Sequence, residues 1–206
     1  MAKLVVFNQV SLDGYFTGER GDLSWAHTRK KDPEWAAFLA ENAASGGTLL
    51  FGRVTYEMMV SYWPTPEAAK NDPVMAERMN SLPKVVFSRS LKKVDWNNTR
   101  LVTGDLADEI RTLKLNPDAD LVILGSGTIV AQLAQQGLVD EYQLVVIPVV
   151  LGKGRTMFEG VSRKPTMKPT SSRTFRNGNL VVSYVPVGGE GAGDEETAEA
   201  MVSSGA

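Results

Sequence analysis

Two glycine-containing segments hold the residues best suited to chemistry, and each begins where an apolar run gives way to a helical pattern. In the first segment, Gly52, Arg53 and Thr55 follow a short buried run. The free backbone N–H groups at a helix start bind anions, and the helix dipole favours the same charge. Arg53 adds a forked pair of donors for a phosphate, and Thr55 adds a hydroxyl. The segment predicts an anion site, with a tight turn carrying a surface arginine as the alternative.

The second segment reads Gly125-Ser126-Gly127-Thr128-Ile129 and follows the apolar run 120–124. Its glycines let the backbone approach a ligand closely, and a helix starting near Thr128 favours a pyrophosphate. The third glycine of a dinucleotide-binding fingerprint is replaced by Val130, and the segment lies late in the chain, so a Rossmann unit is only weakly indicated. Two such sites in one domain of modest size predict a ligand with two separated phosphate groups.

Apolar runs of strand character alternate with helical patterns around these segments. Strands are predicted at 4–10, 48–51, 84–87, 120–124 and 142–150, and helices at 54–62, 73–81, 105–115 and 128–136. A further helix begins at Pro33 with Asp32 as its N-cap, and a hairpin joins 172–176 to 180–185. The order predicts an α/β fold with a mixed, mostly parallel sheet, an antiparallel C-terminal hairpin and helices on both faces. One domain is expected over 1–187, with 188–206 as a disordered tail.

Composition excludes several classes of function. Of the 206 residues, 43% are hydrophobic and 22% are charged, and the net charge of −2 gives no basic excess for a nucleic-acid partner. Without cysteine, and with His27 as the single histidine, the chain cannot build a zinc–cysteine site or a histidine cluster, so no metal is predicted. A Ser-His-Asp triad is not indicated, because His27 lies in a polar run. The apolar start is soon interrupted by Asn8 and Gln9, which argues against a signal peptide or membrane partner and favours a cytoplasmic protein.

Five segments in order resemble a known family. The segment 51–57, with its glycine, arginine, threonine, aromatic residue and glutamate, is similar to dihydrofolate reductases, as are 85–89 and 125–127. Ser11-Leu12-Asp13-Gly14 and 148–154 resemble the reductase domain of riboflavin-biosynthesis deaminase-reductases and its stand-alone relatives. The resemblance covers residues 3–187 and implies a dihydrofolate-reductase-like fold, with a small heterocycle as substrate.

The resemblance also implies bound NADPH. It assigns the adenosine end and the 2′-phosphate to Arg53, Ser88 and Arg89, and charge-assisted bonds from both arginines would favour NADPH over NADH. The contacts that it implies with the pyrophosphate are Val54, Thr55, Ser126, Gly127, Thr128 and Ile129. Those that it implies around the nicotinamide are Gln9, Phe16 and Gly125.

The proton donor has three candidates. Dihydrofolate reductases place a carboxylate at the start of the helix before the glycine–arginine turn, where this chain has Asp32 and Glu34. Phe38 matches the substrate-side phenylalanine of that helix, and counting back from it selects Glu34, which leaves Asp32 as a cap. In the alternative interpretation both acids only cap the helix, and Asp13 contacts the substrate.

Three functions remain open at this point. The first is an NADPH-dependent pyrimidine or pterin reductase, the second an NADPH-dependent oxidoreductase acting on an unrelated carbonyl or xenobiotic compound, and the third a nucleotide-binding module without turnover. A homodimer is expected from the nearly continuous apolar run 142–150 and from the resemblance. Two aromatic residues are expected to line the substrate pocket. The candidates are Trp25, Trp35, Phe38, Tyr56 and Trp63.

Overall fold

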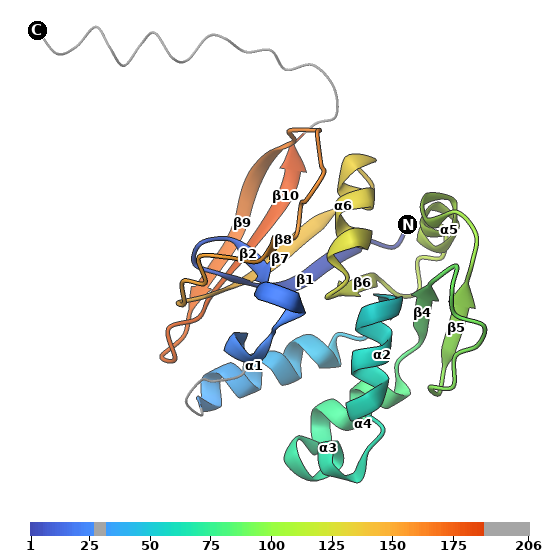
Figure 1. Cartoon of the computed structure of the whole chain (residues 1–206), viewed down its shortest axis with the longest axis horizontal. Helices are drawn as coiled ribbons and strands as arrows, with labels where there is room; N and C mark the ends of the chain where they lie inside the picture. Colours follow the sequence, from blue (N-terminus) through green and yellow to red (C-terminus); the bar gives the residue numbers. More distant parts are fainter. Residues whose placement is uncertain (27–31, 188–206) are drawn as a thin grey trace, which may run out of the picture.

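One eight-stranded sheet organises the protein, in the order β5-β4-β3-β6-β1-β7-β10-β9 (Figure 1). The structure is a computed structural model, and it describes residues 1–26 and 32–187. His27 and the predicted tail 188–206 lie outside the described residues. The strands are β1 Leu4–Ser11, β3 Thr48–Gly52, β4 Lys84–Phe87, β5 Thr99–Val102, β6 Leu121–Leu124, β7 Glu141–Ile147, β9 Thr166–Thr174 and β10 Leu180–Val187, with β2 Tyr15–Thr17 and β8 Arg155–Thr156 forming a second, two-stranded sheet.

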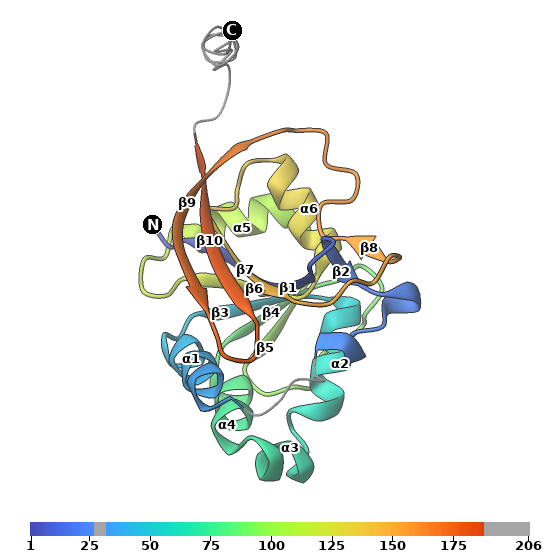
Figure 2. The ribbon, with the colours of Figure 1, turned by 90° about the vertical axis from the view of Figure 1, so that its left-hand side faces the viewer.

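Helices cover both faces of the large sheet, as Figure 2 shows. They are α1 Pro33–Ala44, α2 Arg53–Tyr62, α3 Pro66–Asn71, α4 Pro73–Ser81, α5 Leu106–Lys114 and α6 Gly127–Gln135, with short 3-10 turns η1 Glu19–Gly21 and η2 Ser24–Ala26. On one face, Ile110 of α5 and Leu133 of α6 pack on Leu4 and Val6 of β1. On the other face, Phe51 of β3 packs in a cluster with α2 and α4. Within the described ranges, no helix combines the length and apolar character needed to cross a bilayer.

Strand directions confirm the predicted fold class. The pairs β5–β4, β4–β3, β3–β6, β6–β1 and β1–β7 are parallel, whereas β7–β10 and β10–β9 are antiparallel. The sheet is therefore mixed and mostly parallel, and the antiparallel hairpin lies at its C-terminal edge. Because parallel strands end at the same edge of a sheet, the turns after β3 and β6 lie side by side.

The largest boundary differences from the prediction are at β7 and β9. The apolar run 142–150 contains β7, which ends at Ile147, where its pairing with β1 also ends. The hairpin strand β9 begins at Thr166 rather than 172, and it is mostly exposed and polar because it forms the edge of the sheet. The strand β7 lies between β1 and β10, and Tyr142 and Val145 are buried inside the chain. The intrachain packing of β7 accounts for its apolar character without a second subunit.

A buried lysine joins the end of α4 to β4, the strand that leads to Ser88 and Arg89. Lys84 is 1% exposed, and its Nζ donates to the carbonyl oxygens of Met79 at 2.9 Å, Asn80 at 3.2 Å and Leu82 at 2.6 Å. The ammonium also lies 4.6 Å from the ring centroid of Trp96. Its charge complements the C-terminal dipole of α4 and satisfies carbonyl groups that a helix end leaves without partners.

We predict that Lys84→Met lowers the free energy of unfolding by about 1–3 kcal/mol, because the methionine fills the space but leaves the carbonyl groups without donors. Urea unfolding of the variant measures this change. The exposed Lys92→Met is the control and should stay within about 0.5 kcal/mol of the wild type. Equal stability of the two variants would contradict the structural role of Lys84.

Candidate functional site

The two glycine-containing turns are joined by hydrogen bonds that cross from one to the other. The backbone N–H of Gly52 donates to Ser126 Oγ at 2.9 Å, and the backbone N–H of Ser126 donates to Thr55 Oγ1 at 3.0 Å. Gly52 ends β3, whereas Ser126 follows β6, the neighbouring strand of the sheet. The two turns therefore lie against each other, and residues of both line the same cavity.

The turn after β6 depends on an unusual backbone conformation. Gly125 and Ser126 both have left-handed backbones, with φ values of +64° and +58°. A Cβ atom added to Gly125 would lie 2.8 Å from Thr55 Cγ2 and 3.0 Å from Thr55 Oγ1. Glycine is required at 125 both by the positive φ and by the close approach of α2.

The helices α2 and α6 begin without the side-chain caps that the other helices have. In neither helix does a first-turn N–H donate to the N-cap side chain, because Gly52 has no side chain and the hydroxyl of Ser126 is turned toward β3. The first two N–H groups of each helix have no carbonyl acceptor within the helix. They belong to Arg53 and Val54 in α2, and to Gly127 and Thr128 in α6. The N-termini of α1, α3, α4 and α5 are capped by the side chains of Asp32, Thr65, Asp72 and Asp105. The two uncapped starts offer backbone donors to an anionic ligand.

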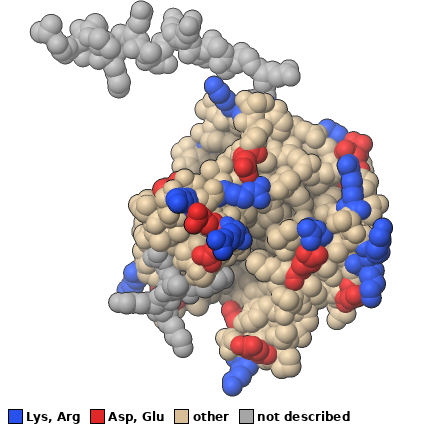
Figure 3. Space-filling view, in the orientation of Figure 1, with Lys and Arg blue, Asp and Glu red and all other residues tan. Residues whose placement is uncertain are grey.

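Both uncapped helix starts line one cavity of about 790 Å³, a size within the range of small-molecule sites. Figure 3 shows a hollow on this face of the molecule with Lys and Arg side chains at its border. Except for Gln9, every predicted cofactor residue lines the cavity: Phe16, Gly52, Arg53, Val54, Thr55, Ser88, Arg89, Gly125, Ser126, Gly127, Thr128 and Ile129. Gln9 lies half-buried on β1, outside the lining. The structure thus brings twelve of the thirteen residues together, while their roles stay predictions.

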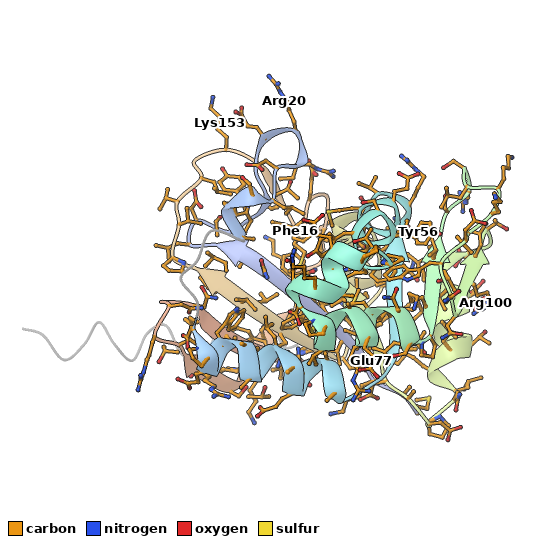
Figure 4. The ribbon with its side chains drawn as sticks, turned by 90° about the horizontal axis from the view of Figure 1, so that it is seen from below. Phe16, Arg20, Tyr56, Glu77, Arg100 and Lys153 are labelled. Atoms are coloured by element: carbon orange, nitrogen blue, oxygen red, sulfur yellow. The ribbon has the colours of Figure 1, made fainter. Side chains whose placement is uncertain are left out.

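Phe16, one of two phenylalanines that line the cavity, lies over the second turn, and the other is Phe87 of β4. A Cβ atom on Gly127 would lie 3.2 Å from two carbon atoms of the Phe16 ring, so the ring rests against the backbone there. Figure 4 shows Phe16 on the inner side of its segment, with Arg20 and Lys153 extending outward above it. Phe16 belongs to β2, which pairs with β8 and forms a roof over the turn.

The expectation that about two of five other aromatic residues wall the pocket is wrong for this cavity. Tyr56 and Trp63 pack with Phe51 in the cluster between the sheet and α2. The other three, Trp25, Trp35 and Phe38, pack in a separate cluster with Val145 of β7. Aromatic residues at helical spacing here fill the core, as such residues usually do.

Cationic side chains stand at the end of the cavity formed by α2 and β4. Arg53 Nη1 lies 2.8 Å from Glu57 Oε2 in an ion pair whose members are 46% and 47% exposed, so the guanidinium is accessible. Arg89 is exposed at the end of β4. Ser88 Oγ accepts hydrogen bonds from the backbone N–H groups of Ser90 and Leu91, and it lies 3.3 Å from Ser90 Oγ, so two hydroxyl groups stand side by side after β4. This end of the cavity fits a phosphate group.

The helix carboxylates lie away from the cavity and have structural partners. Asp32 Oδ1 accepts from the backbone N–H groups of Glu34 and Trp35, at 3.0 and 3.4 Å, which confirms the predicted N-cap. Its Oδ2 accepts from the backbone N–H of Asn177 at 3.1 Å, so it also ties α1 to the C-terminal hairpin. Glu34 pairs with Arg173 at 3.0 Å. Neither carboxylate lines the cavity, and their catalytic role stays a prediction.

Asp13 holds the loop before β8. Its carboxylate accepts from Ser11 Oγ at 2.6 Å, from the backbone N–H of Leu151 at 3.1 Å and from the backbone N–H of Gly152 at 2.7 Å. The Ser11 hydroxyl and these backbone donors hold the pKa of Asp13 below its ordinary value of 3.8. Because it remains ionised at neutral pH, Asp13 is suited to anchoring this loop and poorly suited to donating a proton.

Sequence reasoning missed several residues of the cavity. Asp105 and Ala107 reach it from the start of α5, Gln132 from α6, and Arg155 from β8. No glycine pattern or phosphate motif marks these positions, and the fold alone brings them beside the two turns. The sequence does contain one local signal near the cavity. Asn8 is a polar residue within the apolar strand β1, and the structure buries it.

The sheet order and the cavity define an α/β protein with a cavity at the carboxyl ends of its parallel strands. The chain belongs to the RibD C-terminal domain family, whose model matches residues 2–181. A relative in Bacillus subtilis (strain 168), the uncharacterized protein YyaP, is 29% identical over 182 residues, covering 88% of this chain and 94% of that protein. A second, YwjB of the same strain, is 25% identical over 173 residues, covering 84% and 92%.

Solved structures share the fold. A putative riboflavin biosynthesis protein from Shewanella sp. PV-4 superposes with a TM-score of 0.70 at 25% identity, covering 91% of this chain and 100% of that one. A diaminohydroxyphosphoribosylaminopyrimidine deaminase/5-amino-6-(5-phosphoribosylamino)uracil reductase from Thermotoga maritima gives 0.63 at 16% identity, covering 90% and 57%. Dihydrofolate reductase from Enterococcus faecalis, complexed with NADP(H), gives 0.55 at 16%, covering 90% and 97%. The dihydrofolate-reductase-like fold is confirmed.

We predict that Gly125→Ala destabilises the protein by more than the roughly 1–2 kcal/mol that a left-handed backbone costs an L-residue. The added methyl group must also displace Thr55, which holds the Ser126 N–H. Gly46→Ala is the matched control, because Gly46 has a φ of +80° and an added Cβ would meet nothing within 4 Å. Urea unfolding compares the two, and an equal loss in both variants would show that the close approach at Gly125 has no energetic consequence.

Proposed function

We propose that this protein is an NADPH-dependent reductase that transfers a hydride to a small heterocyclic substrate, either a pyrimidine of riboflavin biosynthesis or a pterin of the dihydrofolate type. The observation that carries the proposal is the pair of uncapped helix starts, α2 and α6, facing one cavity of about 790 Å³. The family and the fold shared with an NADP(H)-complexed dihydrofolate reductase support the same conclusion.

The donors in the cavity fit a dinucleotide. Val54 and Thr55 on one side, and the backbone N–H groups of Gly127 and Thr128 on the other, would hold the pyrophosphate. Arg53, Ser88 and Arg89 would hold the adenosine end with its 2′-phosphate, and Ile129 would contact the pyrophosphate side. Arg53 must leave Glu57 to do so, which requires little free energy because an exposed ion pair contributes only about 0–1 kcal/mol.

In this proposal the chain orients the reactants and excludes water. The nicotinamide supplies the hydride when it is bound. Gly125 allows the backbone to approach the ring closely, and Phe16 covers the turn from the roof side, with Gln9 placed beyond it on β1. Holding the reactants together in an apolar, water-poor site lowers the barrier to transfer.

One observation favours a second candidate function. Asp13, Asp32 and Glu34 all lie outside the cavity lining, and each is held by structural partners. A nucleotide-binding module without turnover needs the cavity but no proton donor. The other alternative, an NADPH-dependent oxidoreductase acting on an unrelated carbonyl or xenobiotic substrate, uses the same cavity and differs only in its substrate.

The homodimer and the cytoplasmic location stay predictions. The dimer was predicted on the run 142–150, and within it β7 is paired on both edges, which leaves the end of the run after Ile147 for contact with a second subunit. Leu12 and Val150 are 65% and 67% exposed and lie close together, since the Leu12 N–H donates to the carbonyl of Val149. These apolar side chains would lie in such a contact.

We predict that the wild-type protein oxidises NADPH in the presence of a pyrimidine or pterin substrate, because the proposed binding mode would place the nicotinamide beside Phe16 and Gly125. The absorbance of the reduced nicotinamide, followed with a panel of such substrates and of simple carbonyl compounds, measures the reaction. Oxidation with carbonyl compounds alone would select the second oxidoreductase. Binding without oxidation of any substrate would select the nucleotide-binding module, and absence of NADPH binding would refute all three functions.

We predict that Arg53→Ala weakens NADPH binding by about tenfold or more and leaves NADH binding nearly unchanged. A charge-assisted hydrogen bond contributes about 1.5–3 kcal/mol, and NADH lacks the phosphate that would receive it. Titration calorimetry with both nucleotides gives the two affinities. Glu57→Ala is the control, because it frees Arg53 from its ion pair and should preserve NADPH affinity. Equal losses for NADPH and NADH would show that Arg53 does not recognise the 2′-phosphate.

A further inference from the structure

Asn8 is a buried polar residue in the middle of an apolar strand. It lies on β1 between Val6 and Val10 on the same face of the sheet, and it is only 4% exposed. Pairing between β1 and β6 ends at Phe7 and Leu124, one residue before Asn8 and Gly125. A carboxamide in such a place requires partners, because an unpaired buried amide is unfavourable.

The partners of Asn8 are the backbone groups of the residue that opens the second turn. Asn8 Oδ1 accepts from the Gly125 N–H at 2.6 Å, and Asn8 Nδ2 donates to the Gly125 carbonyl oxygen at 3.0 Å. The side-chain amide thus continues the pairing of β1 with β6 beyond the backbone ladder. It binds both backbone groups of Gly125 where φ becomes positive.

The same carboxamide also reaches the roof of the cavity. Asn8 Nδ2 lies 3.2 Å from Met157 Sδ, and Met157 directly follows β8, the partner of the strand that carries Phe16. A Cβ atom on Gly127 would lie 3.9 Å from the Cα of Met157 and 3.2 Å from the Phe16 ring. Asn8 therefore contacts the turn that forms the floor and the residue that supports the roof.

We propose that Asn8 is the positioning residue of this site. Its carboxamide holds Gly125 in the left-handed conformation that directs the N–H groups of Gly127 and Thr128 into the cavity. Asn8 does not touch the ligand, and its effect reaches the ligand through the turn. The link to the nucleotide rests on the proposed function, whereas the link to the turn stands on the hydrogen bonds alone.

Two substitutions separate positioning from simple burial. Asn8→Leu keeps the size of the side chain and removes both hydrogen bonds, so NADP⁺ should bind about tenfold more weakly at every pH tested. Asn8→Asp keeps an acceptor for the Gly125 N–H, but an ionised carboxylate faces the Gly125 carbonyl oxygen without a proton to donate. Burial raises the pKa of the introduced carboxyl group, and once protonated it can accept and donate as the amide does. The affinity of Asn8→Asp should therefore recover as the pH falls.

The measurement is titration calorimetry with NADP⁺ between about pH 5 and pH 8, where a buried carboxyl group titrates. The affinity of each variant is divided by that of the wild type at the same pH, which cancels the titration of the 2′-phosphate. Val6→Ala is the matched control, since Val6 is fully buried two residues earlier on the same face and outside the cavity lining. It should lower the stability and leave the affinity unchanged.

NADP⁺ affinity of Asn8→Leu within about twofold of the wild type, or no recovery of Asn8→Asp at low pH, would overturn the proposal. Hydrogen exchange of the segment 125–128 in the free protein gives a second readout, with faster exchange expected in Asn8→Leu than in Val6→Ala. If the wild type binds no nicotinamide nucleotide, the proposed function fails, and the exchange data still test Asn8. Unchanged exchange in that segment would then refute its role.

Discussion

The two hydrogen bonds between the turns after β3 and β6 are the constraint on which the site depends. A serine at an N-cap ordinarily accepts from the N–H groups of its own helix. The left-handed backbone at Ser126 turns its hydroxyl toward the Gly52 N–H instead, and Thr55 receives the N–H of Ser126 in return. The groups that would have capped α6 thus fix the distance between α6 and α2, and the first N–H groups of both helices remain available on the cavity side.

The parts of the fold that the sequence predicted are those whose signal is local. Asp32 and Pro33 mark the start of α1 by chemistry that acts within one turn of helix, and the glycine pairs mark the ends of β3 and β6. The strands β5 and β9, the helix α3 and the small β2–β8 sheet were missed or cut short. Edge strands such as β9 need no alternation of apolar residues, and β2 exists because the chain near residue 155 lies beside it.

The candidate site divides in the same way. The two turns could be predicted because glycine stands next to arginine in one and next to serine in the other. Arg155 and Gln132 could not, because they line the cavity only when the fold brings distant segments together. The sequence could not assign the role of the carboxylates, because an acidic residue at a helix start can serve as an N-cap or as a proton donor. The contact of Asp32 with the N–H of Asn177, far along the chain, shows what its second oxygen does, and no sequence pattern contains that contact.

The roof of the cavity is positioned by the strand that also supports its floor. From β1, Asn8 holds Gly125 below and contacts Met157 above. A few residues later, Asp13 fixes the loop that leads into β8 by accepting the N–H groups of Leu151 and Gly152. The hydrogen bonds that lower the pKa of Asp13 keep it charged, and a charged acceptor makes the stronger bonds. The segment Ser11-Leu12-Asp13-Gly14, which resembles the riboflavin-type reductases, therefore has a structural function in this chain, because its carboxylate holds the loop that leads into β8.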